Sequence, residues 1–184
     1  MNRYQYNDLL IEVLDEPVYT HGSADNSFNY PQAYFGDGAG EYSASKHGVK
    51  IYRDGEIINS CILIGSGGAT AIHPTSVAMN HDRLVACCCN TIFCLSIPDL
   101  ALQWKTEADP VTCFGIFNYE DDYIVHGELQ VTRLGRDGQI KWKFGGADIF
   151  VSVEEEEFKL EDDGILLTDF GKKKYKIDFD GNLI

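Results

Sequence analysis

Acidic side chains form the most concentrated chemical feature of this sequence. Two clusters occur, and the longer one contains four consecutive glutamates. Like charges crowded together repel one another, which lowers stability unless water or a basic partner screens them. Partner binding would therefore offset this cost, while a solvated acidic turn is the simpler explanation. The members are Glu120, Asp121 and Asp122, then Glu154, Glu155, Glu156, Glu157, Glu161, Asp162 and Asp163.

Thiols are the second group with possible chemistry. Three of the six cysteines are adjacent in the segment ACCCN at 86–90. Successive side chains of a strand point to opposite faces, so we expect Cys87 and Cys89 on one face and Cys88 on the other. Zinc sites usually pair ligands about two to four residues apart, and neither CxxC nor HxH nor HxxxH occurs. We predict no metal site and interpret the cysteines as reduced core residues.

A glycine-rich segment, GSGGAT at 65–70, could in principle bind phosphate. Such loops need a following helix and a nearby lysine, whereas AIHPTSVAM follows here and favours strand and turn. Ser66 lies in GSG rather than in a GxSxG elbow, and no histidine or acid has a spacing that marks it as a catalytic partner. The sequence therefore predicts a connecting loop, no catalytic residue and no cofactor.

An aromatic-rich segment at 21–45 combines glycine and serine with tyrosine and phenylalanine. Long irregular loops within a domain are often functional, and exposed aromatic side chains anchor interfaces. The same side chains could instead cover the edge of a sheet, and the sequence leaves both interpretations open. The candidate anchors are Phe28, Tyr30, Tyr34, Phe35 and Tyr42.

A repeated skeleton underlies these features. Turn signals separate alternating, strand-like runs at intervals of 45, 38 and 43 residues, and Asn59, Trp104 and Trp142 stand five residues after the first three. Asp-Gly between alternating segments is a strong hairpin signal, because a type I′ turn needs positive φ at both central positions. The turns are Asp54-Gly55, Pro98-Asp99-Leu100, Asp137-Gly138 and Asp180-Gly181.

One unit reads as strand, tight turn, strand, Asp-Gly, strand with Trp, loop and strand, within about 40 residues. In this skeleton, DGQIKWKF at 137–144 and its weaker copy PDLALQWKT at 98–106 resemble the β-propeller repeats of quinoprotein-like and WD-repeat-like proteins. The resemblance covers about residues 46–184 and implies blades in which both tryptophans pack between neighbouring sheets. Equivalent connections would then emerge on one rim, which would place the two acidic clusters on the same side.

We therefore predict an all-β fold, a small or incomplete β-propeller of three to four antiparallel blades, with a twisted β-sandwich as the alternative. The chain, 1–184, is expected to form one domain with an irregular insert at about 21–45. The last unit stops at Ile184 just after its turn. In closed propellers an N-terminal strand often completes the last blade, and LLIEVLD at 9–15 is the candidate.

Composition limits the possible partners. The formal net charge is −14, which argues against nucleic-acid binding, because phosphate backbones select basic surfaces. The only apolar run near the N-terminus contains Asp8 and Glu12, so it does not resemble a signal peptide, and no stretch reaches the ~20 apolar residues of a membrane span. A cytoplasmic protein fits these features.

In size, acidity and lack of a catalytic motif, the sequence resembles the small cytoplasmic immunity proteins that bacteria pair with secreted toxins. The resemblance implies a non-enzymatic inhibitor that binds a basic toxin, such as a nuclease domain. The two acidic clusters would steer the partner and the aromatics of 28–42 would anchor it. The alternatives are a propeller-type scaffold or ligand-binding domain, and then a carboxylate-based enzyme, for which His73, His81 or His126 would lie beside an acid in a pocket.

Overall fold

Strands and their turns account for the regular structure of the computed structural model, which describes residues 1–152 and 156–184. The strands form four sheets. Sheet A has five strands in the order β1-β2-β4-β5-β3, in which β3 pairs with β5 in parallel and the other pairs are antiparallel. Its strands are β1 (Asn2–Tyr6), β2 (Leu9–Asp15), β3 (Gln32–Phe35), β4 (Ser45–Arg53) and β5 (Glu56–Gly65).

Sheets B, C and D are antiparallel and follow chain order, with four, four and three strands. Sheet B consists of β6 (Val77–Asn80), β7 (Arg83–Cys88), β8 (Thr91–Ser96) and β9 (Leu102–Glu107). Sheet C consists of β10 (Cys113–Tyr119), β11 (Asp122–Gly127), β12 (Gln130–Leu134) and β13 (Ile140–Gly145). Sheet D consists of β14 (Phe158–Glu161), β15 (Gly164–Thr168) and β16 (Lys174–Ile177).

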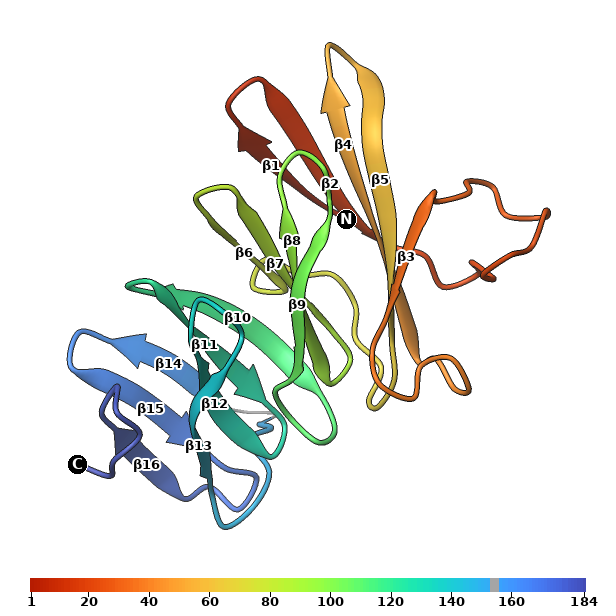
Figure 1. The fold of residues 1–184 in the computed structure, drawn as a ribbon. Coiled ribbons are helices and arrows are strands. Elements are labelled where there is room, and N and C mark those ends of the chain that lie inside the picture. Colours follow the sequence, from red (N-terminus) through yellow and green to blue (C-terminus); the bar gives the residue numbers. More distant parts are fainter. Residues whose placement is uncertain (153–155) are drawn as a thin grey trace.

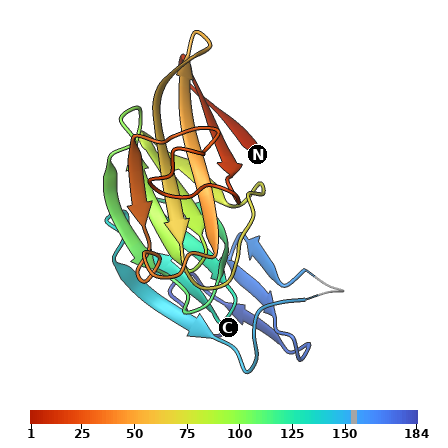
Figure 2. The ribbon, with the colours of Figure 1, turned by 90° about the vertical axis from the view of Figure 1, so that its right-hand side faces the viewer.

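The sheets follow one another face to face from the N-terminal to the C-terminal end of the molecule (Figure 1). Residues 16–44 connect β2 to β4 and cross the outer face of sheet A, as Figure 2 shows. The predicted all-β, propeller-type blades are thus confirmed, although face-to-face stacking of sheets is also a property of the β-sandwich alternative. Within the described chain, no helix is long and apolar enough to cross a membrane.

The boundary between successive sheets lies one strand earlier in the chain than the sequence-based prediction placed it. The apolar segment after Trp104 was assigned to the end of the same unit, but it forms β10, the first strand of sheet C. The corresponding segment 147–152 after Trp142 contains no strand. Periodicity identifies strands in a chain of repeats but does not fix where one sheet ends, because pairing partners decide that boundary.

The prediction that residues 9–15 complete the last sheet is wrong. This segment is β2, which lies between β1 and β4 in sheet A. A two-residue turn at Asn7-Asp8 joins it to β1, whose residues 2–6 were not recognised as a strand. Local hairpin pairing therefore takes precedence here over a long-range closure, which would add loop entropy.

Apolar side chains fill the spaces between the sheets. Successive side chains of each central strand point to opposite faces, so one strand contributes to the cores on both sides of its sheet. In β7, Leu84 and Ala86 pack toward sheet A, whereas Val85 and Cys87 pack toward sheet C. Because both faces are covered, these strands read as continuous apolar runs. The core between sheets C and D is largely aromatic, and a fourth core joins the 16–44 connection to the outer face of β5.

The six cysteines are buried and unpaired, as predicted for core residues. The predicted alternation is wrong for Cys89, which lies after the end of β7 with a φ of 56°. Cys88 and Cys89 therefore both face the core between sheets A and B, while Cys87 faces sheet C. A hydrogen bond with Cys88 lowers the pKa of the Cys89 thiol to about 6, whereas burial raises the pKa of Cys88.

One side-chain N–H in each of the first three sheets reaches the last turn of the next sheet. Asn59 Nδ2 donates to the Pro98 carbonyl at 2.9 Å, Trp104 Nε1 to Arg136 at 3.0 Å, and Trp142 Nε1 to Phe179 at 2.9 Å. These are the three residues that stand five positions after each turn in the sequence. The repeated turn-and-Trp skeleton is therefore an inter-sheet contact, and the predicted packing of both tryptophans between sheets is confirmed.

Two of the Asp-Gly turns need glycine for a second reason besides its positive φ. Gly138 and Gly181 have φ of 81° and 84°. A Cβ at Gly138 would lie 2.5 Å from Trp104 Cδ2, and one at Gly181 would lie 2.8 Å from Trp142 Cδ2. The indole ring of one sheet thus rests directly on the turn backbone of the next.

We predict that Gly138→Ala destabilises the protein more than Gly55→Ala, measured as the free energy of unfolding in urea. Gly55 has the same conformation, with a φ of 84°, but has no atom within 4 Å of an added Cβ. Its substitution should cost only the ~1 kcal/mol of left-handed backbone. Gly138→Ala should cost about 1–3 kcal/mol more, because the methyl group displaces Trp104. Equal costs would show that the indole does not press on the turn.

Candidate functional site

Exposed carboxylates gather at one end of the sheets. Turns between first and second strands, and between third and fourth, lie at the same end of an antiparallel sheet, seen along the upper left of Figure 1. We call this end the turn face. Its exposed acids are Asp8, Asp54, Glu56, Asp82, Asp99, Glu120, Asp121, Asp137, Asp162, Asp163 and Asp180.

The acidity of the turn face has a local structural origin. The first turn of each sheet has two residues, and the second is always aspartate: Asp8, Asp82, Asp121 and Asp163. Aspartate suits turns because its short side chain can bond nearby backbone groups. Repetition of the sheets converts this local preference into a row of negative charges along one end of the molecule.

The two predicted acidic clusters lie only partly on one side. Glu120-Asp121 and Asp162-Asp163 are equivalent first turns of sheets C and D, so these four acids do share the turn face. Glu156 and Glu157 precede β14 at the other end of sheet D, where the Glu157 carbonyl accepts the Thr168 N–H at 3.0 Å. The prediction that the whole run occupies the equivalent connection is wrong for these two. Glu154 and Glu155 lie outside the described residues.

Asp122 differs from its acidic neighbours because it is buried. Its Oδ2 accepts hydrogen bonds from Arg133 Nε at 2.7 Å and Lys141 Nζ at 2.6 Å. In sheet D, Glu161 and Asp163 have a weaker counterpart of this arrangement, since Lys176 Nζ lies 2.8 Å from Asp163 and 3.7 Å from Glu161. Asp122 therefore joins three strands of sheet C and is not exposed to a partner.

The predicted aromatic anchors lie in the 16–44 connection, mostly against sheet A. Tyr30 is buried and donates to Glu16, and burial raises its pKa. Tyr34 in β3 donates to the Leu100 carbonyl at 2.8 Å. Phe28 lies under the Lys50 ammonium, 4.0 Å from the ring centroid.

Phe35 makes an edge contact with His21, with ring centroids 5.2 Å apart. Tyr42, by contrast, is 67% exposed. The structure thus places most of the predicted aromatics over the otherwise open face of sheet A and leaves one tyrosine free to contact a partner.

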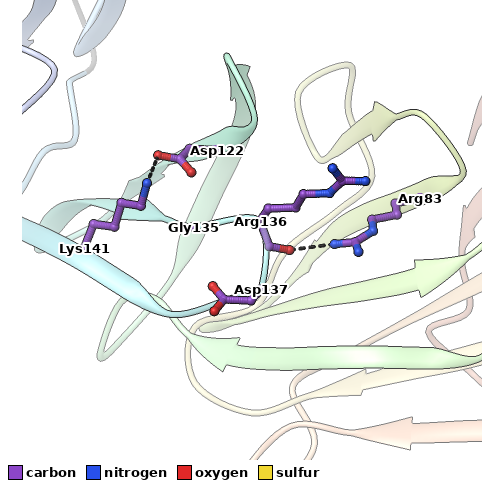
Figure 3. A pocket seen from close by; sticks show the side chains of 6 residues that line it. All are labelled: Arg83, Asp122, Gly135, Arg136, Asp137 and Lys141. Carbon is purple, nitrogen blue, oxygen red and sulfur yellow. Dashed lines mark hydrogen bonds and ion pairs between the residues drawn. The ribbon is translucent and has the colours of Figure 1, made fainter.

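A cleft of about 390 Å³ opens on the turn face between sheets B and C (Figure 3). Three cations and two carboxylates line it, together with Gly135. Arg83 Nη1 donates to the Arg136 carbonyl at 2.6 Å, the same oxygen that accepts the Trp104 indole N–H. Sequence analysis did not identify this cleft, because its residues come from β7, β11 and the β12–β13 hairpin. The charged lining residues are Arg83, Asp122, Arg136, Asp137 and Lys141.

The three histidines considered for catalysis differ in their surroundings. His73 and His81 are exposed, and His73 Nδ1 contacts Thr75 Oγ1 at 3.1 Å. His126 is buried, stacks on Phe158 and lies 3.3 Å from the Phe150 carbonyl. Burial lowers its pKa to about 4. Among the described residues, no cluster of His, Cys, Asp and Glu has an arrangement that could hold a metal ion.

His47, which sequence analysis did not consider, does lie beside an acid. Its Nδ1 is 3.1 Å from Asp15 Oδ1, although the geometry is not that of an aligned hydrogen bond, and its Nε2 is 3.0 Å from Thr70 Oγ1. Thr70 Oγ1 also accepts the Cys89 N–H at 3.0 Å. The imidazole is 1% exposed, and desolvation lowers its pKa. These contacts join β2, β4 and the β5–β6 connection to sheet B.

Asp109 was also missed. It is fully buried and accepts four backbone N–H groups, from Val111, Thr112, Leu129 and Gln130, at 2.7–3.1 Å. It thus joins the β9–β10 connection to the β11–β12 turn, because buried amides without partners would be costly. The dipeptide Asp-Pro at 109–110 was a turn signal that could have identified it.

Comparisons with known proteins show similarity of fold only. No protein-family model matches the sequence, and no curated protein matches it. The chain is similar to the computationally designed Ika8 protein, with a TM-score of 0.53 and 12% identity over 76% of this chain and 44% of that one.

Two further structures are similar at lower scores. BamB from Moraxella catarrhalis has a TM-score of 0.45 and 13% identity, over 77% of this chain and 42% of that one. The WD40 beta propeller domain of Doa1 has a TM-score of 0.43 and 10% identity, over 97% of this chain and 60% of that one. The chain therefore spans about half the length of the structures it matches.

We predict that Asp122→Asn lowers the free energy of unfolding by about 2–3 kcal/mol, because it leaves the poorly exposed Arg133 guanidinium with only the exposed Asp180 carboxylate, 3.7 Å away. The exposed neighbour provides the control: Asp121→Asn should change stability by no more than about 0.5 kcal/mol. Urea denaturation measures both. Similar values for the two variants would contradict the structural role of Asp122.

We predict that the buried His126 makes the free energy of unfolding depend on pH. Its folded pKa of about 4 lies below the ordinary value of 6.5, so only the unfolded chain binds the proton between these values. The stability linked to His126 is complete above pH 6.5 and is lost as pH falls toward 4, by about 3 kcal/mol. His126→Phe should remove this part of the pH slope. The exposed His81→Gln control should retain it, and an unchanged slope in His126→Phe would contradict the assignment.

Proposed function

We propose that this chain is a non-enzymatic binding protein that blocks a basic protein partner through its turn face. The observation that carries the proposal is the alignment of exposed aspartates and glutamates from all four sheets at one end of a chain of net charge −14. The turn face also carries Arg53, Arg83, Arg136 and Lys141, but acids outnumber these cations. An excess of one sign attracts an oppositely charged partner and accelerates association. An immunity protein that occludes the substrate groove of a basic toxin, such as a nuclease domain, is the proposed class.

Two features support binding rather than solubility alone as the role of these charges. Asp99, Asp137 and Asp180 lie in turns whose backbone accepts an inter-sheet hydrogen bond, so the backbone that carries these three acids is held in place before a partner arrives, which reduces the entropy lost on binding. The turn face also carries Arg83 and Arg136 in its cleft, and these cations would repel a basic group placed over them, which restricts how a basic partner can be oriented. Tyr42 lies in the connection outside the turn face and is therefore a secondary contact in this proposal.

A test should compare two variants of equal charge. One neutralises turn-face acids (Asp82→Asn, Glu120→Gln, Asp121→Asn, Asp162→Asn); the other neutralises exposed acids elsewhere (Asp25→Asn, Glu41→Gln, Asp148→Asn, Glu156→Gln). A basic partner captured from the native lysate and purified is then mixed with each. We predict an association rate constant at least tenfold lower at low salt for the turn-face variant alone.

The same partner must lose its activity when wild-type protein is added. If both variants associate equally fast, net charge rather than the turn face is responsible. If no basic protein is captured, the inhibitor proposal fails. The second candidate function, a ligand-binding scaffold, then becomes the better explanation. The cleft of Figure 3 is the observation that favours it.

A further inference from the structure

We propose that the cleft between sheets B and C binds one anionic group, a carboxylate or a phosphate, between the guanidinium groups of Arg83 and Arg136. This inference does not depend on a basic protein partner. The two arginines enter the cleft from different sheets, Arg83 from β7 and Arg136 from the β12–β13 turn. Figure 3 shows both guanidinium groups on the same side of the turn.

Neither guanidinium has a carboxylate partner among the described residues. Arg83 uses one N–H for the backbone carbonyl of Arg136, and no ion pair involves either side chain. Of the two carboxylates of the lining, Asp122 binds Lys141 and Arg133, whereas Asp137 is exposed and its Oδ1 accepts the Gln139 N–H at 3.2 Å. Arg83 and Arg136 carry like charges and line the same cleft, so they repel each other, and a bound anion would reduce that repulsion.

The next interface along the chain provides an internal comparison. Between sheets C and D, Arg133 Nη1 donates to the Phe179 carbonyl at 2.8 Å, as Arg83 does to Arg136. There, however, Arg133 also contacts Asp122 at 2.6 Å and Asp180 at 3.7 Å, and the turn carries Phe179, stacked on Tyr119. The interface between B and C thus has an extra cation, Arg136, at the position of Phe179. Its two carboxylates, Asp122 and Asp137, form no ion pair with Arg83 or Arg136 among the described residues.

A buried hydroxyl lies within the electrostatic reach of the same arginines. Tyr123 is fully buried, and its hydroxyl meets hydrogen-bond geometry with no group of the described chain, although Asn80 is close enough to influence it. Burial raises the pKa of Tyr123, and the charges of Arg83 and Arg136 oppose that rise. Tyr123 does not line the cleft, so it shows only that the field of both arginines extends into the core beside it.

The chemistry of the cleft selects one small anion rather than a polyanion. Arginine forks match the oxygens of carboxylate and phosphate groups. The exposed acids of the turn face surround the cleft and would repel an extended chain of phosphates. The cleft, of about 390 Å³, is open to solvent and lined mostly by charged side chains, which suits one small anionic group rather than an apolar ligand. A free carboxylate or phosphate group on a compact ligand fits these limits.

The two tryptophans provide a direct readout in the unmodified protein. Trp104 donates its indole N–H to the Arg136 carbonyl at the cleft, while Trp142 makes the equivalent bond to Phe179 one interface away. In ¹⁵N-labelled protein, inorganic phosphate or acetate should move the Trp104 indole signal in a saturable way at millimolar concentration. The Trp142 signal should stay, and Trp142→Phe assigns the two.

Sodium chloride at matched ionic strength is the control for screening. A response to phosphate alone, or to acetate alone, identifies which source of the anionic group the cleft prefers. If neither anion moves the Trp104 signal beyond the chloride control, or both indole signals move alike, the proposed site does not exist.

Two variants test whether the Arg136 guanidinium itself binds the anion. Arg136→Gln removes a guanidinium but keeps the carbonyl that Trp104 binds, so its indole signal should report an intact fold and an affinity lower by at least tenfold. Arg53→Gln is the matched control, because Arg53 lies beside the equivalent Asp-Gly turn of sheet A and pairs with Asp8. It should bind as the wild type does. Undiminished binding by a folded Arg136→Gln protein would overturn the assignment.

Discussion

A hydrogen bond from one sheet to the last turn of the next is the contact on which this fold depends. Apolar burial holds neighbouring sheets together but is not directional, so it does not fix how far one sheet slides past another. The N–H groups of Asn59, Trp104 and Trp142 do so, because each reaches one backbone carbonyl of the following turn. Gly138 and Gly181 let the indole rings approach that turn. On the opposite end, buried His47 and Asp109 join connections to neighbouring sheets.

Much of this arrangement could be predicted from the sequence, because repeats place equivalent residues in equivalent positions. Alternation and Asp-Gly spacing predicted most strands of sheets B, C and D and the packing of both tryptophans between sheets. They missed β1, and they missed β3, which lies in the segment 21–45 that was expected to be irregular. They did not predict the sheet boundaries or the place of β2, which depend on pairing between strands of similar apolar character. The cleft at Arg83 and Arg136 could not be predicted from the sequence for another reason. Its residues are far apart in the chain, and only the contact between sheets B and C brings them together.

The same structural repetition accounts for the charge distribution. Each first turn ends in an aspartate because the backbone there favours it, and the stacked sheets bring these turns to one end. The aspartate in each turn has a local structural cause, and a binding function could still use the electrostatic field that these aspartates produce together. The buried Asp122 and the exposed Asp121 show how adjacent carboxylates divide between these roles: one stabilises sheet C, and the other contributes to the surface that we propose binds a basic protein.

Hydrogen exchange of the two indole N–H groups tests the central structural claim most directly. If the bonds to Arg136 and Phe179 fix the sheets, both indole protons should exchange only when the sheets separate. Their protection should then approach that of backbone amides in the central strands β7 and β11. Exchange at the rate of a free indole, while those amides remain protected, would contradict the account, because it would show that the sheets stay stacked without these bonds.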